Sequence, residues 1–291
     1  MKISVSSYSY QQYIRAGKMT QLDVVRKAAE MGFSGIDFID LAPCSKPTLE
    51  DQIKYAEEIR KEAEKYGIEI VAYTIGANLY NGSPEADEKE VERLKGQVRV
   101  AAAMGASLLR HDVCKSEKLA DGRVIGFDRM LPTIAANARK VTEYAQQFGI
   151  RTTSENHGFV AQDSDRVEAL YNAVGHENYG LLIDIGNFAC ADEDSVHAVS
   201  RLASYAFHVH AKDFHMRPFG YVPAEGESFF STRGCNLLAG CAVGDGDIPV
   251  AQCLAIFKRV GYNGFLTIEY EGAEDCIEGI ARGHEYLKKL I

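Results

Sequence analysis

The chain has 291 residues, of which 46% are hydrophobic and 25% charged, and its formal net charge is −9. This length suits one α/β barrel or two average domains, and the lack of a long apolar run argues against a membrane-spanning helix. Because nucleic-acid binding normally needs a basic face, the acidic balance argues against a DNA or RNA partner. The opening MKISVSSYSY has no basic segment followed by an apolar one, so we expect no secretion signal and a cytoplasmic protein.

The cysteines are odd in number and scattered. The chain has seven, with no CxxC pair, at Cys44, Cys114, Cys190, Cys235, Cys241, Cys253 and Cys276. This spacing is typical of reduced, mostly buried thiols, and it predicts neither a disulfide framework nor a structural zinc site.

Short apolar runs alternate with longer helical patterns along the whole chain. The runs that predict strands cover residues 2–8, 34–39, 69–75, 107–113, 150–156, 180–186, 206–212 and 264–270. Helical patterns between them end on glycines at the usual stop position, namely Gly32, Gly67 and Gly261. Such alternation predicts an α/β fold, a single (β/α)₈ TIM barrel over residues 1–291. Neither GxGxxG after the first strand nor GxxxxGK[ST] occurs. The sequence therefore lacks the motifs that would indicate a dinucleotide-binding fold or a P-loop fold.

Residues 214–246 do not follow this alternation of strand and helix patterns. They are glycine-rich and show little periodicity, so we expect a long loop without regular structure after the seventh strand. Loops of this length in compact domains are often functional, and a lid over the barrel mouth is one such role.

Four ionisable residues fall near the ends of the last four predicted strands: Glu155, Asp184, His210 and Glu269. Catalytic groups in such barrels come from the C-terminal ends of several strands. Taken singly, each residue is more often a salt-bridge partner or a helix cap. Together, however, three converging carboxylates would raise one another's pKa, and a divalent ion removes that repulsion. Asp184 lies in the stretch LLIDIGNF, in which five of eight residues are strongly apolar, so its carboxylate would be costly there without a bound cation.

The donor set indicates which ion to expect. Oxygen-rich ligands with one imidazole and no thiolate suit Mn²⁺ best, with Mg²⁺, Co²⁺ or Zn²⁺ as alternatives. We therefore predict one divalent ion at one rim of the barrel.

The segments around these residues resemble the xylose isomerase-like barrel superfamily, also described as sugar phosphate isomerases and epimerases. The resemblance covers nearly the whole chain and is carried by SENHG (154–158), LLIDIGN (181–187), HAKD (210–213) and LTIEYEG (266–272). It implies that the four residues bind one divalent ion. It also implies that Glu155 and Glu269 act as an acid–base pair on opposite faces of the substrate, through an enediolate.

Further polar side chains are expected at the same mouth. We predict His157 and Lys212 as additional catalytic groups, and as substrate contacts His111, Asn187, His208 and Arg217. Several relatives have a histidine where this chain has Asn187, which can donate a hydrogen bond but cannot titrate.

Each of these residues has a plainer interpretation. His111 and His157 suit hydrogen-bonded rim positions, and His208 suits a satisfied core histidine one layer deeper. Lys212 could pair with Asp213, and Arg217 could be solvated. Three further polar residues near the ends of the early strands, Tyr8, Asp37 and Tyr73, are typical of packing or capping features.

Several functions remain open at this point. The leading interpretation is a metal-dependent isomerase or epimerase of a sugar or keto-sugar. The second is a metal-dependent lyase, either an inosose-type dehydratase or a C-glycoside deglycosidase subunit that cleaves a 3-oxo-glycoside. A DNA-repair endonuclease and a non-catalytic sugar-binding barrel are less favoured. A homo-oligomer or a small partner subunit is compatible with the sequence, and the two aspartates of GDGDI (244–248) favour an unphosphorylated substrate.

Overall fold

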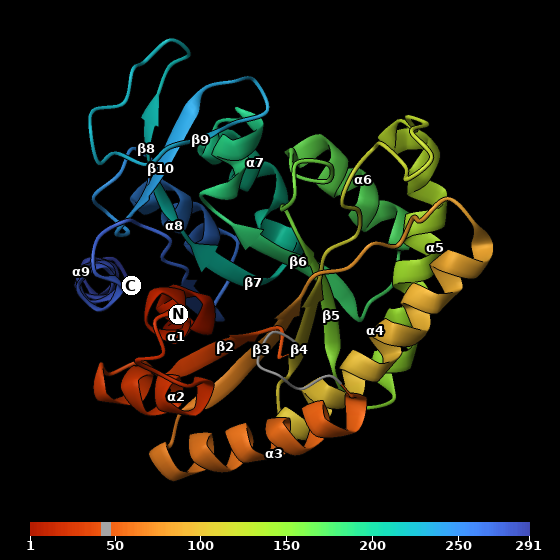
Figure 1. Cartoon of the computed structure of the whole chain (residues 1–291), viewed down its shortest axis with the longest axis horizontal. Coiled ribbons are helices and arrows are strands. Elements are labelled where there is room, and N and C mark those ends of the chain that lie inside the picture. Colours follow the sequence, from red (N-terminus) through yellow and green to blue (C-terminus); the bar gives the residue numbers. More distant parts are fainter. Residues whose placement is uncertain (42–47) are drawn as a thin grey trace.

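The structure, a computed structural model, describes residues 1–41 and 48–291. Parallel strands close into a barrel in the order β1-β11-β7-β6-β5-β4-β3-β2 (Figure 1). The barrel strands are β1 Lys2–Ser6, β2 Gly35–Ile39, β3 Glu69–Ile75, β4 Leu108–His111, β5 Arg151–Glu155, β6 Tyr179–Asp184, β7 Ala206–Ala211 and β11 Phe265–Ile268. All eight predicted strands are therefore present, and the predicted (β/α)₈ barrel is confirmed.

Helices follow the strands and surround the barrel (Figure 1). The α-helices are α1 Gln11–Arg15, α2 Gln21–Glu30, α3 Leu49–Tyr66, α4 Pro84–Met104, α5 Phe127–Gln146, α6 Ser164–Val174, α7 Ser195–Leu202, α8 Val250–Arg259 and α9 Cys276–Lys288. Short 3₁₀ turns lie at η1 Ser7–Tyr10, η3 Asn187–Ala191 and η4 Ala203–Tyr205.

Local signals explain where these helices begin and end. Thr20 and Asp23 form a capping box at the start of α2, which satisfies backbone N–H groups that would otherwise lack partners. Gly67 ends α3 at φ 65°, a left-handed conformation that glycine adopts without steric cost. On α2, Val24 and Val25 are fully buried against the barrel wall. The helix layer thus makes the barrel a rigid scaffold for its mouth.

The segment after β7 differs from the expectation of a loop without regular structure. It forms a three-stranded antiparallel sheet in the order β8-β10-β9, which we call the inserted sheet. Its strands are β8 Asp213–Arg217, β9 Phe230–Ser231 and β10 Leu237–Cys241. The prediction failed because β9 is only two residues long and because burial does not alternate along the five-residue strands β8 and β10.

The inserted sheet is fastened to the barrel at its turn. Asp192 accepts hydrogen bonds from Thr232 Oγ1 at 2.7 Å and from Asn236 Nδ2 at 2.8 Å. Arg233 Nη1 donates to Asp163 Oδ2 at 2.7 Å, at the start of α6. Because these contacts tie the turn to the loops after β5 and β6, the inserted sheet forms a fixed wall beside the mouth.

The structure also bears on the cysteines and on whether any helix could cross a membrane. The six cysteines within the described ranges form no disulfide, and Cys44 lies outside those ranges. Over the same ranges, none of the helices combines the length and apolar composition that crossing a membrane requires.

Candidate metal centre

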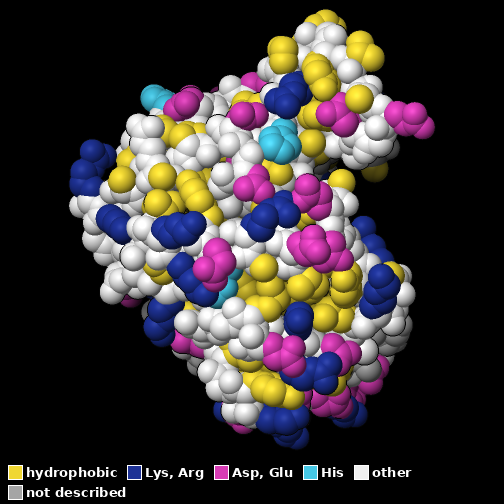
Figure 2. Space-filling model, turned by 90° about the vertical axis from the view of Figure 1, so that its left-hand side faces the viewer, with side chains coloured by type: hydrophobic (Ala, Val, Ile, Leu, Met, Phe, Trp, Pro, Cys, Tyr) yellow, Lys and Arg dark blue, Asp and Glu magenta, His cyan; other side chains and the backbone are white. Residues whose placement is uncertain are grey.

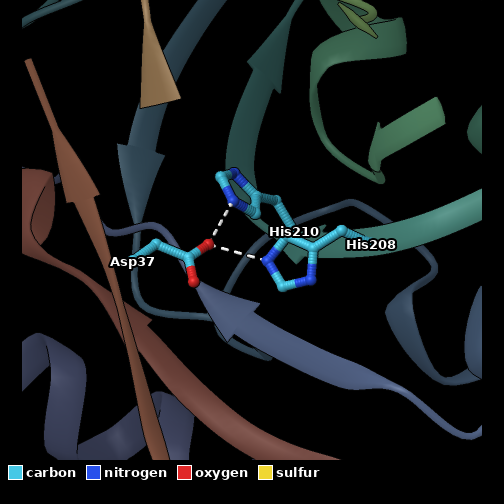
Figure 3. A group of neighbouring side chains, drawn as sticks. All are labelled: Asp37, His208 and His210. Atoms are coloured by element: carbon cyan, nitrogen blue, oxygen red, sulfur yellow. Dashed lines mark hydrogen bonds and ion pairs between the residues drawn. The ribbon is translucent and has the colours of Figure 1, made fainter. Parts of the chain in front are cut away.

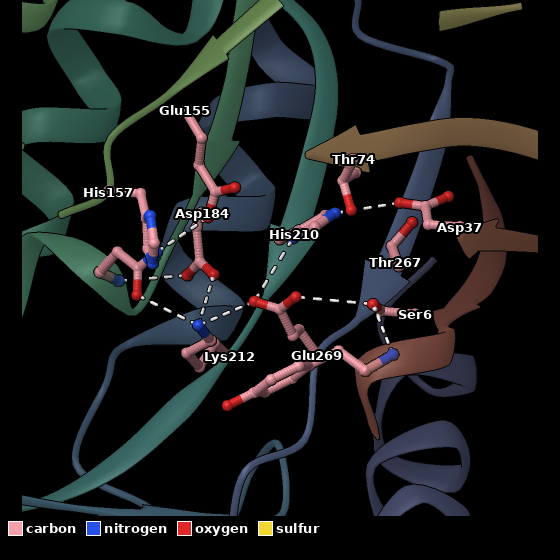
Figure 4. A network of polar contacts seen from close by, with 12 residues as sticks. Ser6, Asp37, Thr74, Glu155, His157, Asp184, His210, Lys212, Thr267 and Glu269 are labelled. Atoms are coloured by element: carbon pink, nitrogen blue, oxygen red, sulfur yellow. Dashed lines mark hydrogen bonds and ion pairs between the residues drawn. The ribbon is translucent and has the colours of Figure 1, made fainter. Parts of the chain in front are cut away.

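The barrel brings together the four residues predicted to bind a metal. Glu155, Asp184, His210 and Glu269 each offer one ligand atom, and these atoms all lie within 4.8 Å of one another (Figure 4). Strand register contributes directly, because Asp184 on β6 pairs with His210 on β7. Glu155 ends β5 and Glu269 follows β11, so the cluster spans four strands at the C-terminal end of the barrel.

Asp184 is held with one oxygen turned into the cluster. Its Oδ1 accepts from the backbone N–H groups of Gly186 at 2.8 Å and Asn187 at 3.1 Å. Its Oδ2 is buried and accepts no hydrogen bond from the described residues, with the Lys212 ammonium at 3.4 Å. Burial raises the pKa of Asp184 to about 6 in spite of Lys212, and Glu155 and Glu269 add to the rise.

Glu155 is neutralised from a neighbouring strand. The Arg110 guanidinium on β4 forms a close ion pair with Glu155 Oε2 and lies 3.3 Å from Asp112 Oδ1. Asn187 Nδ2 donates to Glu155 Oε1 at 2.9 Å. Both oxygens of this carboxylate are thereby oriented before any ligand arrives.

Glu269 is neutralised by Lys212. Lys212 Nζ lies 2.8 Å from Glu269 Oε2, and it donates to Asn187 Oδ1 at 3.2 Å. Burial opposes the charge of Lys212, but Asp184 and Glu269 raise its pKa well above the ordinary value. Burial likewise opposes ionisation of Glu269, yet Lys212 and His210 hold its pKa well below the usual range. The ammonium and the carboxylates therefore keep one another charged.

His210 presents one ring nitrogen to the cluster. Its Nδ1 lies 3.7 Å from Glu269 Oε2, is buried, and has no hydrogen-bond partner among residues 1–41 and 48–291. Its Nε2 is bonded to Asp37 on β2 at 3.0 Å.

A divalent ion fits this donor set. Asp184 Oδ2 and His210 Nδ1 are buried polar atoms for which the described part of the chain supplies no hydrogen bond, and such atoms are costly unless a ligand satisfies them. Both point to the space that Glu155 and Glu269 also face (Figure 4). Three carboxylates and one imidazole are donors that Mn²⁺, Mg²⁺, Co²⁺ and Zn²⁺ all accept.

Two of the other predicted residues lie close to the cluster. Asn187 contacts both Glu155 and Lys212, as described above. His157 is 46% exposed, and its Nδ1 is bonded to Asp112 Oδ1 at 3.1 Å. Burial opposes protonation of His157, but Asp112 raises its pKa.

Within the described ranges, the three remaining residues predicted as substrate contacts form no hydrogen bond or ion pair with the carboxylates of the cluster. His208 lies one layer deeper, where its Nε2 bonds to Asp37 at 2.7 Å and to Thr267 Oγ1 at 2.9 Å. Arg217, on the inserted sheet, lines the cavity beside the cluster, and its Nη1 donates to the Met216 carbonyl oxygen at 2.8 Å.

His111 faces the helix layer. It pairs with Ile75, two residues beyond Tyr73, and the Tyr73 hydroxyl reaches Gln97 on α4. Since strand side chains alternate, His111 points away from the barrel interior, and Arg110 takes the inward position.

Arg110 is the functional residue that sequence reasoning missed. In the run SLLRHDV, Arg110 and His111 are both polar and both buried, so alternation of burial does not reveal which one faces inward. The signal that could have found it is chemical: a buried arginine needs a carboxylate, and Glu155 lies on the adjacent strand.

A cavity of about 670 Å³ lies beside the cluster, between the inserted sheet and residues 270–274. Tyr8 and Glu271 line it, and Glu271 Oε2 is 3.6 Å from Lys212 Nζ, so the cavity borders the cluster. Figure 2 views this side, where a lobe with hydrophobic side chains at its outer end projects from the body. A volume of this size is typical of sites for small organic ligands, at about 300–1,000 Å³.

Comparisons with known proteins agree with this architecture. The model of the xylose isomerase-like TIM barrel family matches residues 25–290. An inosose dehydratase of Mesomycoplasma hyopneumoniae (strain 7448) is 23% identical over 278 residues, covering 92% of this chain and 87% of that protein. The rhizopine catabolism protein MocC of Rhizobium meliloti is 25% identical over 255 residues, covering 80% and 73%.

Solved structures share the fold at low sequence identity. The IolI protein with a bound zinc atom superposes with a TM-score of 0.74 at 15% identity, covering 100% of this chain and 99% of that one. A D-allulose 3-epimerase from Methylomonas sp. gives a TM-score of 0.73 at 15% identity, covering 100% and 98%. Because the family model spans most of its length, this chain belongs to the xylose isomerase-like TIM barrel family.

Proposed function

We propose that this protein is a divalent-metal-dependent enzyme that removes a proton from the carbon beside the carbonyl of a keto-sugar or cyclic keto-polyol. The observation that carries the proposal is the convergence of Glu155, Asp184, His210 and Glu269 within 4.8 Å. The similarity to inosose dehydratases and sugar epimerases supports this class of chemistry.

A divalent ion at the cluster would act as a Lewis acid on the carbonyl oxygen and a neighbouring hydroxyl, which acidifies the C–H between them. Side chains of the protein would carry out the proton transfers. Glu155 and Glu269 reach the cluster from β5 and from the end of β11, so they can move a proton on two sides of a bound ring. Lys212 supplies a third proton-carrying group at 2.8 Å from Glu269.

Two outcomes of this step are supported by different observations. The two glutamates favour the isomerase or epimerase outcome, because one can take a proton and the other can return it from the opposite side. The Lys212 ammonium and the relatives named as dehydratases favour the lyase outcome, because an ammonium can protonate a leaving hydroxyl. We rank the isomerase or epimerase first.

The substrate proposed here carries no phosphate. Asp213 accepts hydrogen bonds from the backbone N–H groups of Gly244 at 2.8 Å, Gly246 at 3.2 Å and Ile248 at 3.1 Å, so these donors of the GDGDI turn are already used. In the adjacent cavity, Arg282 is paired with Asp245 at 2.9 Å. A neutral polyol matches these surroundings better than an anion.

The metal site is tested by elemental analysis. We expect about one equivalent of divalent metal per chain in the wild type after incubation with Mn²⁺, and very little in the double variant Glu155→Gln, Asp184→Asn. The matched control, Asp121→Asn with Glu285→Gln, removes two exposed carboxylates and should keep the wild-type content. An equal metal content in all three proteins would contradict the proposal.

The reaction is tested by incubating the Mn²⁺-loaded protein in D₂O with a panel of ketoses and inososes. Exchange of a C–H for C–D in a product that is still an isomer identifies the isomerase or epimerase. Loss of one water identifies the dehydratase. A metal-loaded protein that neither exchanges nor dehydrates any member of the panel would refute the proposed function.

A further inference from the structure

Asp37 faces the rings of two histidines, His208 and the proposed metal ligand His210 (Figure 3). Its Oδ2 accepts from His208 Nε2 at 2.7 Å and from His210 Nε2 at 3.0 Å. All three residues come from strands of the barrel and are at most 1% exposed. Across the parts of the chain that the structure describes, these two rings are the ion-pair partners found for Asp37.

The hydrogen bonds decide which nitrogen of His210 carries a proton. An ionised carboxylate only accepts, so the Nε2 atoms that contact Asp37 must both donate. The proton of His210 is therefore held on Nε2, whatever occupies Nδ1. As a result Nδ1, which faces Glu269 Oε2 at 3.7 Å, is the nitrogen available to a cation.

We propose that Asp37 is the positioning residue of the metal centre, which holds His210 in the tautomer and ring orientation that present Nδ1 to the ion. This inference rests on the proposed metal site. Partners of this kind, a carboxylate behind a ligating histidine, fix the ring and make it a better ligand.

The same three residues could instead hold a second ion, and the distances argue against this. Nitrogen ligands lie about 2.0–2.1 Å from a zinc ion and are separated from the other ligands by the ion itself. Here Asp37 Oδ2 lies 2.7 Å and 3.0 Å from the two Nε2 atoms, closer than the distance of about 3.3 Å that separates two ligand atoms on a tetrahedral zinc ion, and each Nε2 carries the proton that it donates to Asp37.

His208 explains how Asp37 is itself kept in place. Its ring holds Asp37 Oδ2 from β7 while its Nε2 also contacts Thr267 Oγ1 on β11 at 2.9 Å. Thr267 in turn contacts Ser4 Oγ on β1 at 2.6 Å. Ser4 therefore belongs to the same buried layer without touching Asp37 or His210, which makes it a suitable control.

The first test compares metal affinity in three proteins. Asp37→Asn keeps the shape of the side chain but replaces the carboxylate with a weaker acceptor, and we expect it to weaken Zn²⁺ and Mn²⁺ binding about 10- to 100-fold in competition titrations. Ser4→Ala, a polar deletion in the same layer, should bind as the wild type does. Equal affinities in Asp37→Asn and the wild type would overturn the inference.

The second test needs no variant and so does not depend on the stability of Asp37→Asn. In the Zn²⁺-loaded wild type with ¹⁵N-labelled histidine, NMR should show His210 bound to zinc through Nδ1 and protonated at Nε2. Zinc bound through Nε2, or two zinc ions per chain, would overturn the inference. A wild type that binds no metal at all would instead refute the proposed function.

Discussion

Lys212 Nζ lies 2.8 Å from Glu269 Oε2 and 3.4 Å from Asp184 Oδ2, beside two of the four residues proposed to bind metal. A buried ammonium in this position neutralises carboxylates that would otherwise repel one another. Because a divalent ion would do the same, Lys212 and the ion act on the same oxygens. The relationship makes the stability of the metal-free protein depend on Lys212.

Lys212→Met tests this dependence. Removing one partner of a buried ion pair costs about 3–5 kcal/mol, so the metal-free variant should melt well below the metal-free wild type. Added Mn²⁺ replaces the missing positive charge, and it should therefore raise the Tm of the variant by more than it raises the Tm of the wild type. Thermal scans with and without Mn²⁺ measure both shifts. Lys140→Met, which breaks the exposed pair with Glu88, is the control, and equal Mn²⁺ shifts in all three proteins would exclude this role.

Arg110→Met tests the second internal cation. The variant leaves Glu155 buried without its guanidinium, and we expect it to lower the free energy of unfolding in urea by about 3–5 kcal/mol. Arg123→Met breaks a surface pair with Asp121 and should cost no more than about 1 kcal/mol. A similar small loss in both variants would mean that Arg110 does not stabilise Glu155.

Asp192→Ala tests the attachment of the inserted sheet. The variant removes the acceptor of Thr232 Oγ1 and Asn236 Nδ2, so the turn should detach from the barrel and the segment should become more mobile. We expect faster proteolysis within residues 218–236 and a higher KM, with little change in Tm. Asp121→Ala, in an exposed turn, is the control. Unchanged cleavage in Asp192→Ala would show that the sheet is held by other contacts.

The pH dependence of stability is predicted at a residue remote from the metal centre. His284 on α9 stacks on Phe33 with ring centroids 4.1 Å apart, and burial, aided by Lys288, lowers its pKa from the ordinary value of 6.5. Below that value the unfolded chain binds a proton that the folded protein does not, so the free energy of unfolding falls as the pH is lowered through about 6.5. His284→Phe keeps the stacking but cannot titrate. Urea unfolding between about pH 7.5 and pH 5.5 should therefore show a smaller loss for the variant than for the wild type, and identical slopes would disprove the assignment.

Much of the candidate site could be predicted because the pattern of the strands is local. Each βα unit carries its own apolar run, and Asp184 and His210 lie at equivalent positions in successive units, so their meeting at one rim followed from the fold. Which side chain of β4 faces the barrel interior could not be predicted in this way. Both faces of that strand are buried, so Arg110 and His111 look alike until the neighbouring strand supplies Glu155.

By itself the sequence determined the number and order of the barrel strands and the identity of the four proposed ligands, since hydrophobic periodicity and residue type are local properties. Only the tertiary structure decided which groups neutralise and orient those ligands: Arg110 for Glu155, Lys212 for Glu269, and Asp37 for His210. Asp37 and His210 are 173 residues apart in the chain. Charge pairing acts through space across strands brought together by barrel closure, and no pattern along the chain records which buried charges will meet.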